Sequence, residues 1–178
     1  MKNYITLFVL ILAGFGFYAC SEDSVSELLE KDLSISEKIE IPVHIDKTDG
    51  TWATFDNTKE ISIDNAQTHD YLNRIKSVKI ERLTYRIMNF NGDPNGQVEA
   101  GFHCANQLSL QNQFVVQTSA QNMMQYQVNE VAELNRIGQA LKNGKKIQTR
   151  YSGKALCDQA DMDFVVEVTL DATLTVGL

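Results

Sequence analysis

The sequence predicts a mainly β protein, a β-sandwich of about seven to eight strands with one inserted helix over residues 129–143 and a short helix over 65–76. Three observations predict this class. Apolar and polar residues alternate with period two over most of residues 35–178, turn signals separate the alternating segments, and one segment has clear helical periodicity. Two packed sheets bury the apolar face of each strand, so the pattern favours a sandwich.

The composition of the 178-residue chain excludes several protein classes. Hydrophobic residues make up 43% and charged residues 22%, which excludes a disordered chain, and 10 Gly with 2 Pro exclude a collagen-like or Pro-rich protein. The formal net charge is −7, whereas a nucleic-acid surface needs clustered Lys and Arg. We therefore expect one compact domain without a nucleic-acid partner.

The first strands are predicted from alternation in residues 35–45. Isoleucine and valine occupy one face of this segment, and mostly polar residues occupy the other. Pro42 has no N–H for a sheet ladder, so we expect this strand at a sheet edge. Ile61 and Ile63 mark a second, shorter strand.

A helix and a long strand are predicted next. Residues 65–76 are expected to form the short helix, with Leu72 and Ile75 pointing inward. A third strand is predicted from Ser77 onward. Its apolar residues change face near residues 81–82, and a β-bulge there would return both sets to the same side.

Residues 91–96, Asn-Gly-Asp-Pro-Asn-Gly, are the strongest turn signal in the chain. We expect them to close a hairpin onto a strand over 98–104. They also partly match a calcium loop, which has alternating oxygen ligands and a bidentate Glu at its twelfth position. The first position is Asn91, Pro94 lies inside the loop and the twelfth position is Phe102, so a turn is the better interpretation.

The helix over 129–143 precedes the last two strands. Asn129 is a candidate N-cap, and Gly144 is placed for a left-handed helix end. The last strand, over 164–176, is longer than most strands, and we expect it to bend or to serve both layers. The apolar stripe of the helix is expected to comprise Val131, Leu134, Ile137 and Leu141.

Residues 1–19 are predicted to be a signal peptide. Lys2 precedes an apolar run over 5–18, which is shorter than the roughly 20 residues needed to span a bilayer. The run 17–20, Phe-Tyr-Ala-Cys, resembles the lipobox of bacterial lipoproteins. The resemblance implies that Cys20 becomes the mature N-terminus and carries a diacylglyceryl thioether, usually with a third acyl chain such as palmitate.

Two or more acyl chains would hold the protein at a membrane without spanning it. Residues 20–34 would then be the lipidated cysteine and a polar tether. Ser21-Glu22-Asp23 resembles the signal that directs Bacteroidota lipoproteins to the outer face of the outer membrane, and a solvated acidic linker is the alternative. We expect a lipoprotein of the cell outer membrane, facing the cell surface or the periplasm, unless Cys20 is an ordinary cysteine of an uncleaved or differently cleaved leader.

The order of elements in residues 35–178 looks like that of the small β-sandwich lipoproteins of the Bacteroidota. This order comprises the turn at 91–96, the helix that ends at Gly144, then Gly153 and the terminal alternating strand. It looks more distantly like immunoglobulin-like sandwiches. The resemblance implies an immunoglobulin-like β-sandwich and carries no function.

Cys104 and Cys157 remain once Cys20 is lipidated. Both are predicted to lie at strand ends, and an even number of cysteines in an oxidising compartment favours a disulfide between them. The alternative is two free, buried thiols. Sequence spacing alone does not place the two Cα atoms within the roughly 7 Å that a disulfide needs.

Trp52 and Phe55 are candidate binding residues in the connection over 49–57. They could form an exposed aromatic platform for a sugar or a partner protein. They could equally close one end of the sandwich, and this interpretation is favoured because a lone Trp in a small domain is mostly buried.

Asp158, Asp161 and Asp163 are weak metal-ligand candidates in the loop before the last strand. Three carboxylates could bind calcium outside the cell, but such a run is more often a solvated acidic loop. No motif of a catalytic nucleophile, a zinc site or a phosphate-binding loop is present in the sequence. The sequence therefore names no catalytic residue and no cofactor.

Three functions are compatible with these observations. The first is a membrane-anchored, non-enzymatic module that binds a protein or a glycan, which an exposed aromatic cluster around Trp52 would favour. The second is a structural or assembly accessory of the envelope, which an unprotected long edge strand would favour. The third is a hydrolase with dispersed carboxylates, which a concave pocket with two facing carboxylates would favour.

Overall fold

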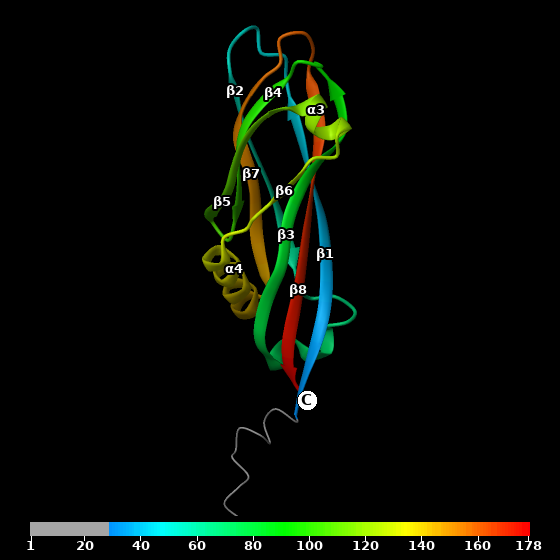
Figure 1. Cartoon of the computed structure of the whole chain (residues 1–178), viewed down its shortest axis with the longest axis vertical. Coiled ribbons are helices and arrows are strands. Elements are labelled where there is room, and N and C mark those ends of the chain that lie inside the picture. Colours follow the sequence, from blue (N-terminus) through cyan, green and yellow to red (C-terminus); the bar gives the residue numbers. More distant parts are fainter. Residues whose placement is uncertain (1–28) are drawn as a thin grey trace, which may run out of the picture.

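The computed structural model describes residues 29–178 (Figure 1). Within these residues the chain forms two antiparallel four-stranded sheets, which confirms the predicted β-sandwich. The predicted signal peptide 1–19 and the lipidation site Cys20 lie outside the described residues. The helices are η1 (a 3-10 helix, His69–Arg74), α3 (Val116–Gln121) and α4 (Val131–Gly144). The strands are β1 (Glu30–Ile45), β2 (Ala53–Ser62), β3 (Ile75–Gly92), β4 (Gln97–Cys104), β5 (Gln107–Val115), β6 (Gln125–Gln127), β7 (Lys146–Leu156) and β8 (Met162–Gly177).

The strand order is β1-β8-β3-β6 in the first sheet and β2-β7-β4-β5 in the second. These neighbours include the pairs of one long hairpin, in which β1 lies beside β8, β2 beside β7, β3 beside β6 and β4 beside β5. A long hairpin rolled into two packed sheets is a jelly roll. The β-sandwich class is as predicted, but the strand order within it is that of a jelly roll and replaces the immunoglobulin-like order that we expected.

The turn over residues 91–96 joins the two sheets and does not close a hairpin. β3 ends at Gly92 in the first sheet and β4 begins at Gln97 in the second. The carboxylate of Asp93, which is 2% exposed, accepts hydrogen bonds from the backbone N–H of Asn95 and of Gln159, both at 2.9 Å. The turn signal correctly predicted where the chain reverses, but it carried no information on which sheet the chain enters next.

The first sheet confirms two local predictions. The register of β3 against β8 shifts between Ile80 and Arg82, and Ile80 and Leu83 are both buried on the two sides of this bulge. β1 is an edge strand, as Pro42 predicted, and it begins at Glu30. Residues 30–34 of the predicted tether therefore pair with β8.

Of the two expectations for the long last strand, that it bends or that it serves both layers, the second is wrong. β8 lies in the first sheet alone, between β1 and β3 (Figure 1). Its inner face packs into the core with seven side chains that are each 2% exposed or less: Phe164, Val166, Val168, Leu170, Ala172, Leu174 and Val176. The length of β8 is explained by its two neighbours, β1 on one side and β3 on the other, which are about as long as β8 itself.

The short helix predicted over residues 65–76 is reduced to η1, whose own residues include none that are buried. Ile75, expected to point inward from that helix, is instead the first residue of β3 and is buried there. Within residues 29–178, no helix is both long and apolar enough to cross a membrane.

The predicted helix over 129–143 is α4, with three corrections. Its N-cap is Glu130, without a side-chain capping bond, and not Asn129. The left-handed residue at its end is Lys145, with φ 62°, and not Gly144. Val131, expected in the apolar stripe, is 68% exposed. The buried face comprises Glu133, Ile137, Gly138 and Leu141.

α4 packs closely against the sheets for two reasons: its buried face contains a glycine, and the one carboxylate on that face, Glu133, is paired with an arginine. A Cβ at Gly138 would meet the backbone carbonyl oxygen of Val78 in β3. The Glu133 carboxylate accepts hydrogen bonds from Arg136 Nε at 2.8 Å and from Ser109 Oγ at 2.5 Å. Arg136 lowers the pKa of Glu133, because its guanidinium stabilises the charged carboxylate. These contacts join the helix to both sheets.

The core contains a connected group of aromatic side chains. Tyr85 lies at its centre, with ring centroids 5.3 Å from Phe102, 4.9 Å from Tyr126 and 5.6 Å from Tyr151. The Tyr85 hydroxyl accepts a hydrogen bond from Asn112 Nδ2 at 2.8 Å. The Tyr151 hydroxyl is buried without a hydrogen-bond partner in the described part of the chain.

Replacing Tyr151 by Phe is expected to leave stability unchanged or to raise it by up to about 1 kcal/mol, because the change removes an unpartnered buried hydroxyl. Replacing Tyr85 by Phe is expected to cost about 1–2 kcal/mol, because Asn112 would lose its acceptor. The midpoint of urea unfolding at unchanged slope measures both effects. A clearly destabilised Tyr151→Phe variant would contradict this account of the hydroxyl.

Replacing Gly138 by Ala is expected to destabilise the protein by about 1–3 kcal/mol, because the new Cβ would press on the backbone of β3. Gly144→Ala, at the end of the same helix, is the matched control, because a Cβ there meets open space. Alanine is better than glycine in a helix by about 0.5–1 kcal/mol, so the control is expected to be neutral or stabilising. Thermal unfolding of both variants measures the difference, and equal stabilisation would disprove the close contact between α4 and β3.

Candidate functional site

Trp52 and Phe55 do not form a common platform. Trp52 lies directly before β2 and is 38% exposed, which favours the surface interpretation for this residue. Phe55 is buried, and its ring centroid lies 5.6 Å from that of Tyr151 in the core. The core interpretation therefore holds for Phe55 alone.

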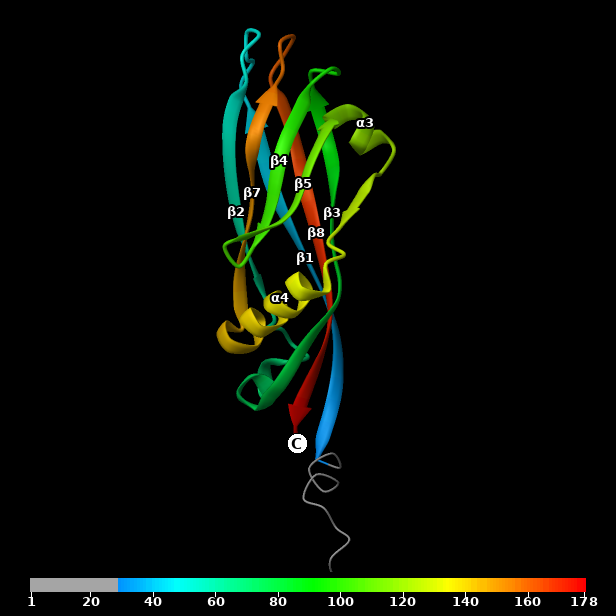
Figure 2. The same cartoon turned by 60° about the vertical axis from the view of Figure 1, so that its left-hand side comes forward.

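The four strands of the second sheet lie side by side in the order β2-β7-β4-β5 (Figure 2). The side chains on its outer face form rows that cross these strands. The backbone register sets these rows, because residues directly opposite each other on neighbouring strands point to the same face. The upper row is Thr54, Lys154, Glu99 and Gln113, the middle row is Asp56, Ser152, Gly101 and Gln111, and the lower row is Thr58, Arg150, His103 and Leu108.

The surface is hollowed over the middle row, because the two central residues of that row, Ser152 and Gly101, are small. A hollow of about 370 Å³ lies over these two residues. A second hollow of about 450 Å³ lies beside Arg150, Thr58 and Gln148. His103 lines both hollows, and we call the two together the groove. Each hollow has the size of an ordinary small-ligand site.

Gly101 makes room for the side chains that shape the groove. A Cβ on Gly101 would lie 2.8 Å from Nε2 of His103 and 2.8 Å from Cδ1 of Leu108. Both side chains can therefore lean over the middle row only because position 101 has none. Leu108 is 51% exposed and gives the groove an apolar end.

Electrostatic pairs cross the groove between β7 and its neighbours. Arg150 donates to both carboxylate oxygens of Asp56, at 2.7 and 2.5 Å, and this contact lowers the pKa of Asp56. Lys154 Nζ lies 2.9 Å from Glu99 Oε2 and 5.0 Å from the ring centroid of Trp52. The cation over its face therefore holds the exposed indole of Trp52 beside the upper row.

A larger hollow of about 520 Å³ lies on the outer face of the first sheet. Two carboxylates, Asp171 and Glu81, line it. Asp171 accepts hydrogen bonds from Ser36 Oγ at 2.6 Å and from Arg82 Nε at 2.7 Å. Glu81 accepts one from Lys79 Nζ at 3.1 Å. No aromatic side chain is among the residues that line it within the described chain. The second sheet is therefore the better candidate, because it combines an exposed aromatic ring with a polar groove.

The predicted disulfide between Cys104 and Cys157 is wrong, and the alternative of two free, buried thiols is confirmed. Cys104 is the last residue of β4, opposite Thr149, whereas Cys157 follows the last residue of β7. β4 and β7 are antiparallel, so the ends of these two strands lie at opposite ends of the sheet. Burial raises the pKa of Cys104 to about 12.

Asp158, Asp161 and Asp163 do not converge on a metal site, and no group of three or more potential metal ligands occurs within residues 29–178. Each instead accepts a hydrogen bond from the end of β1 or the segment after it. Asp158 accepts from the N–H of Gly50 at 2.7 Å, Asp161 from the N–H of Lys47 at 2.9 Å, and Asp163 from Nδ1 of His44 at 2.7 Å. The contacts of Asp158 and Asp161 fasten the 46–52 loop to the loop between β7 and β8, and that of Asp163 joins β8 to β1.

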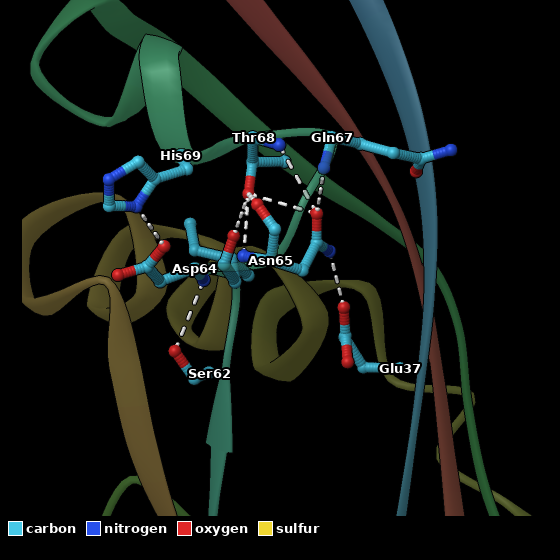
Figure 3. Close-up of polar contacts among 8 residues, drawn as sticks. Glu37, Ser62, Asp64, Asn65, Gln67, Thr68 and His69 are labelled. Atoms are coloured by element: carbon cyan, nitrogen blue, oxygen red, sulfur yellow. Dashed lines mark hydrogen bonds and ion pairs between the residues drawn. The ribbon is translucent and has the colours of Figure 1, made fainter.

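A polar cluster between β2 and η1 was not predicted from the sequence (Figure 3). Asn65 Oδ1 accepts hydrogen bonds from the N–H of Gln67 and of Thr68, at 2.8 and 3.2 Å, and Asn65 Nδ2 donates to Glu37 Oε1 at 2.5 Å. The buried Thr68 hydroxyl donates to the carbonyl of Ile63. The cluster satisfies its own polar groups and fixes the chain against β1, so we assign it a structural role.

No known protein family matches the chain, and no curated protein sequence matches it. Among solved structures, it is similar to a chain of Desmodium yellow mottle tymovirus, with a TM-score of 0.37 and 14% identity over 83% of this chain and 84% of that one. For a chain of turnip yellow mosaic virus the values are 0.31 and 14%, over 83% and 95%. For the structure of the same virus at 100 K they are 0.28 and 14%, over 81% and 96%. Similarity at this level carries no conclusion, and the jelly-roll fold rests on the strand order.

Proposed function

We propose that the protein is a membrane-anchored, non-enzymatic binding module of the bacterial outer membrane, and that the groove on the outer face of its second sheet binds glycans. The observation that carries the proposal is the exposed Trp52 beside this polar groove. An indole face packs against the C–H face of a sugar ring, while hydroxyl, amide and imidazole groups hydrogen-bond to sugar hydroxyls.

A glycan is favoured over a protein partner by the composition of this face. A stable protein interface needs an apolar core inside a polar rim. Here the middle of the face is polar, with Ser152, Gln111 and Asp56, and the exposed apolar side chains Trp52 and Leu108 lie at its borders. This arrangement supports hydrogen bonding to a polar ligand across the middle of the face.

The end of the sandwich at which β1 begins suits the proposed lipid anchor on Cys20. β1 begins and β8 ends at the same end of the elongated sandwich, where the N–H of Leu178 donates to the carbonyl of Leu29 at 2.7 Å (Figure 1). An anchor attached ahead of β1 would hold this end near the membrane. The groove would then stand along the side of the molecule, facing the cell surface or the periplasm.

The two alternative functions have less support. The edge strand β1 is long, as an assembly accessory would need, but Asn57 Nδ2 donates to the carbonyl of Pro42 at 2.9 Å, and Pro42 has no N–H to offer. The carboxylates beside the groove, Asp56 and Glu99, are both ion-paired. So are Asp171 and Glu81, the two carboxylates that line the hollow on the first sheet. A hydrolase needs one carboxyl group with a raised pKa, whereas that of Asp56 is lowered.

The anchor is tested by replacing Cys20 with Ala. We expect the wild-type protein to sediment with membranes and to incorporate a labelled fatty acid, and the variant to lose both properties, because a lipid anchor needs the thiol. Fractionation and labelling of cells that express each form measure this. A variant that is labelled as strongly as the wild type would disprove lipidation at this residue.

Glycan binding is tested with Trp52→Ala on immobilised bacterial, plant and animal polysaccharides. We expect the wild type to bind at least one of them and the variant to bind it about tenfold more weakly, because the stacking surface is lost. Met123→Ala is the control, because Met123 is also apolar and exposed but lies between α3 and β6, at the edge of the first sheet. Equal binding by all three proteins would rule out Trp52 as a ligand contact.

A further inference from the structure

Charged side chains on the outer face of the second sheet are bound to opposite charges on neighbouring strands. Arg150 of β7 bonds to both oxygens of Asp56 in β2, and Lys154 of β7 bonds to Glu99 in β4. These partners have side chains between 35% and 52% exposed, so a ligand in the groove could touch them.

A third pair completes the pattern at the lower end of the face, where Lys146 Nζ lies 3.1 Å from Glu60 Oε2. The three cations and three carboxylates of these pairs cancel one another. The face is therefore neutral on a chain whose formal net charge is −7. A neutral face on an acidic protein restricts the ligands that it can accept.

A ligand with its own charge would meet a penalty in this groove. An acidic group would find the charges of Arg150 and Lys154 already neutralised by Asp56 and Glu99, and it would lie close to one of these carboxylates. A basic group would find Asp56 and Glu99 already paired and would lie close to Arg150 or Lys154. Like charges placed side by side oppose binding, and breaking an existing ion pair adds to the cost.

The uncharged groups between the ion pairs suit a ligand that both donates and accepts hydrogen bonds. Ser152, Gln111 and Gln148 each carry a donor and an acceptor and line the groove. His103 lines both hollows, and the structure gives neither of its ring nitrogens a hydrogen-bond partner within residues 29–178. Partial burial and the nearby Arg150 lower the pKa of His103, so the neutral ring also offers one donor and one acceptor.

We infer that the groove selects uncharged sugar chains and excludes glycans that carry uronic acids or sulfate. The inference rests on the proposed glycan-binding function and narrows it to one chemical class. A sugar hydroxyl both donates and accepts a hydrogen bond, which matches the neutral side chains of the middle and lower rows, and it disturbs none of the ion pairs.

The test compares neutral polysaccharides with their own acidic derivatives. A glucan, a galactan and a mannan are each used unchanged and after oxidation of C6 to a carboxylate, and binding of the full-length protein is measured in detergent at low salt. We expect the protein to bind at least one neutral polymer and to bind its oxidised form at least about tenfold more weakly.

A pair of variants then locates the cause of this selectivity. Glu99→Gln releases Lys154 beside the groove and is expected to shift the preference toward the oxidised polymer by at least about threefold. Glu167→Gln is the control, because it releases Arg86 on the outer face of the first sheet and changes the net charge by the same amount. The control is expected to keep the wild-type preference.

Each outcome supports or overturns a stated claim. Equal or tighter binding of the oxidised polymer by the wild type overturns the selectivity and leaves glycan binding intact. Binding of none of the polymers, neutral or oxidised, counts against glycan binding itself and overturns the selectivity with it. Equal shifts in Glu99→Gln and Glu167→Gln would show that net charge, and not the pairing in the groove, sets the preference.

Discussion

The pairing of β8 with a strand on each side is the constraint on which the rest of the structure depends. Its inner face is buried along its length, and its two edges hold β1 and β3 in register. Once β8 lies beside β1, the rolled hairpin places β7 beside β2 in the opposite sheet. The same order brings β7 next to β4, so that Ser152 and Gly101 become neighbours and the groove has its floor.

Local rules predicted the features that depend on neighbouring residues. The change of apolar face near Arg82 predicted a bulge in β3, and Pro42 predicted an edge strand. Features that depend on the order of strands were not predicted. The turn at 91–96 was placed in a hairpin, and Cys104 was paired with a cysteine at the other end of the sheet.

The groove shows the same division between local pattern and strand order. The alternation in 97–103 and 148–154 identifies Glu99, His103 and Arg150 as outward-facing residues. It does not show that they lie in neighbouring rows of one sheet, because β2 and β7 are not consecutive in sequence with the strands beside them. Exposed ion pairs such as Arg150 with Asp56 contribute only about 0–1 kcal/mol to stability.

β1 begins and β8 ends at the same end of the sandwich (Figure 1), and this has a mechanical consequence. A pull applied to the chain ahead of Glu30 would enter the protein along the axis of β1, a 16-residue strand that pairs with β8 throughout. Antiparallel hydrogen bonds run perpendicular to the strands, so this force shears many of them together and does not open them one by one. A pulling force between a ligand on the second sheet and the start of β1 would therefore act in shear on the β1–β8 pairing, the direction in which that pairing resists force best.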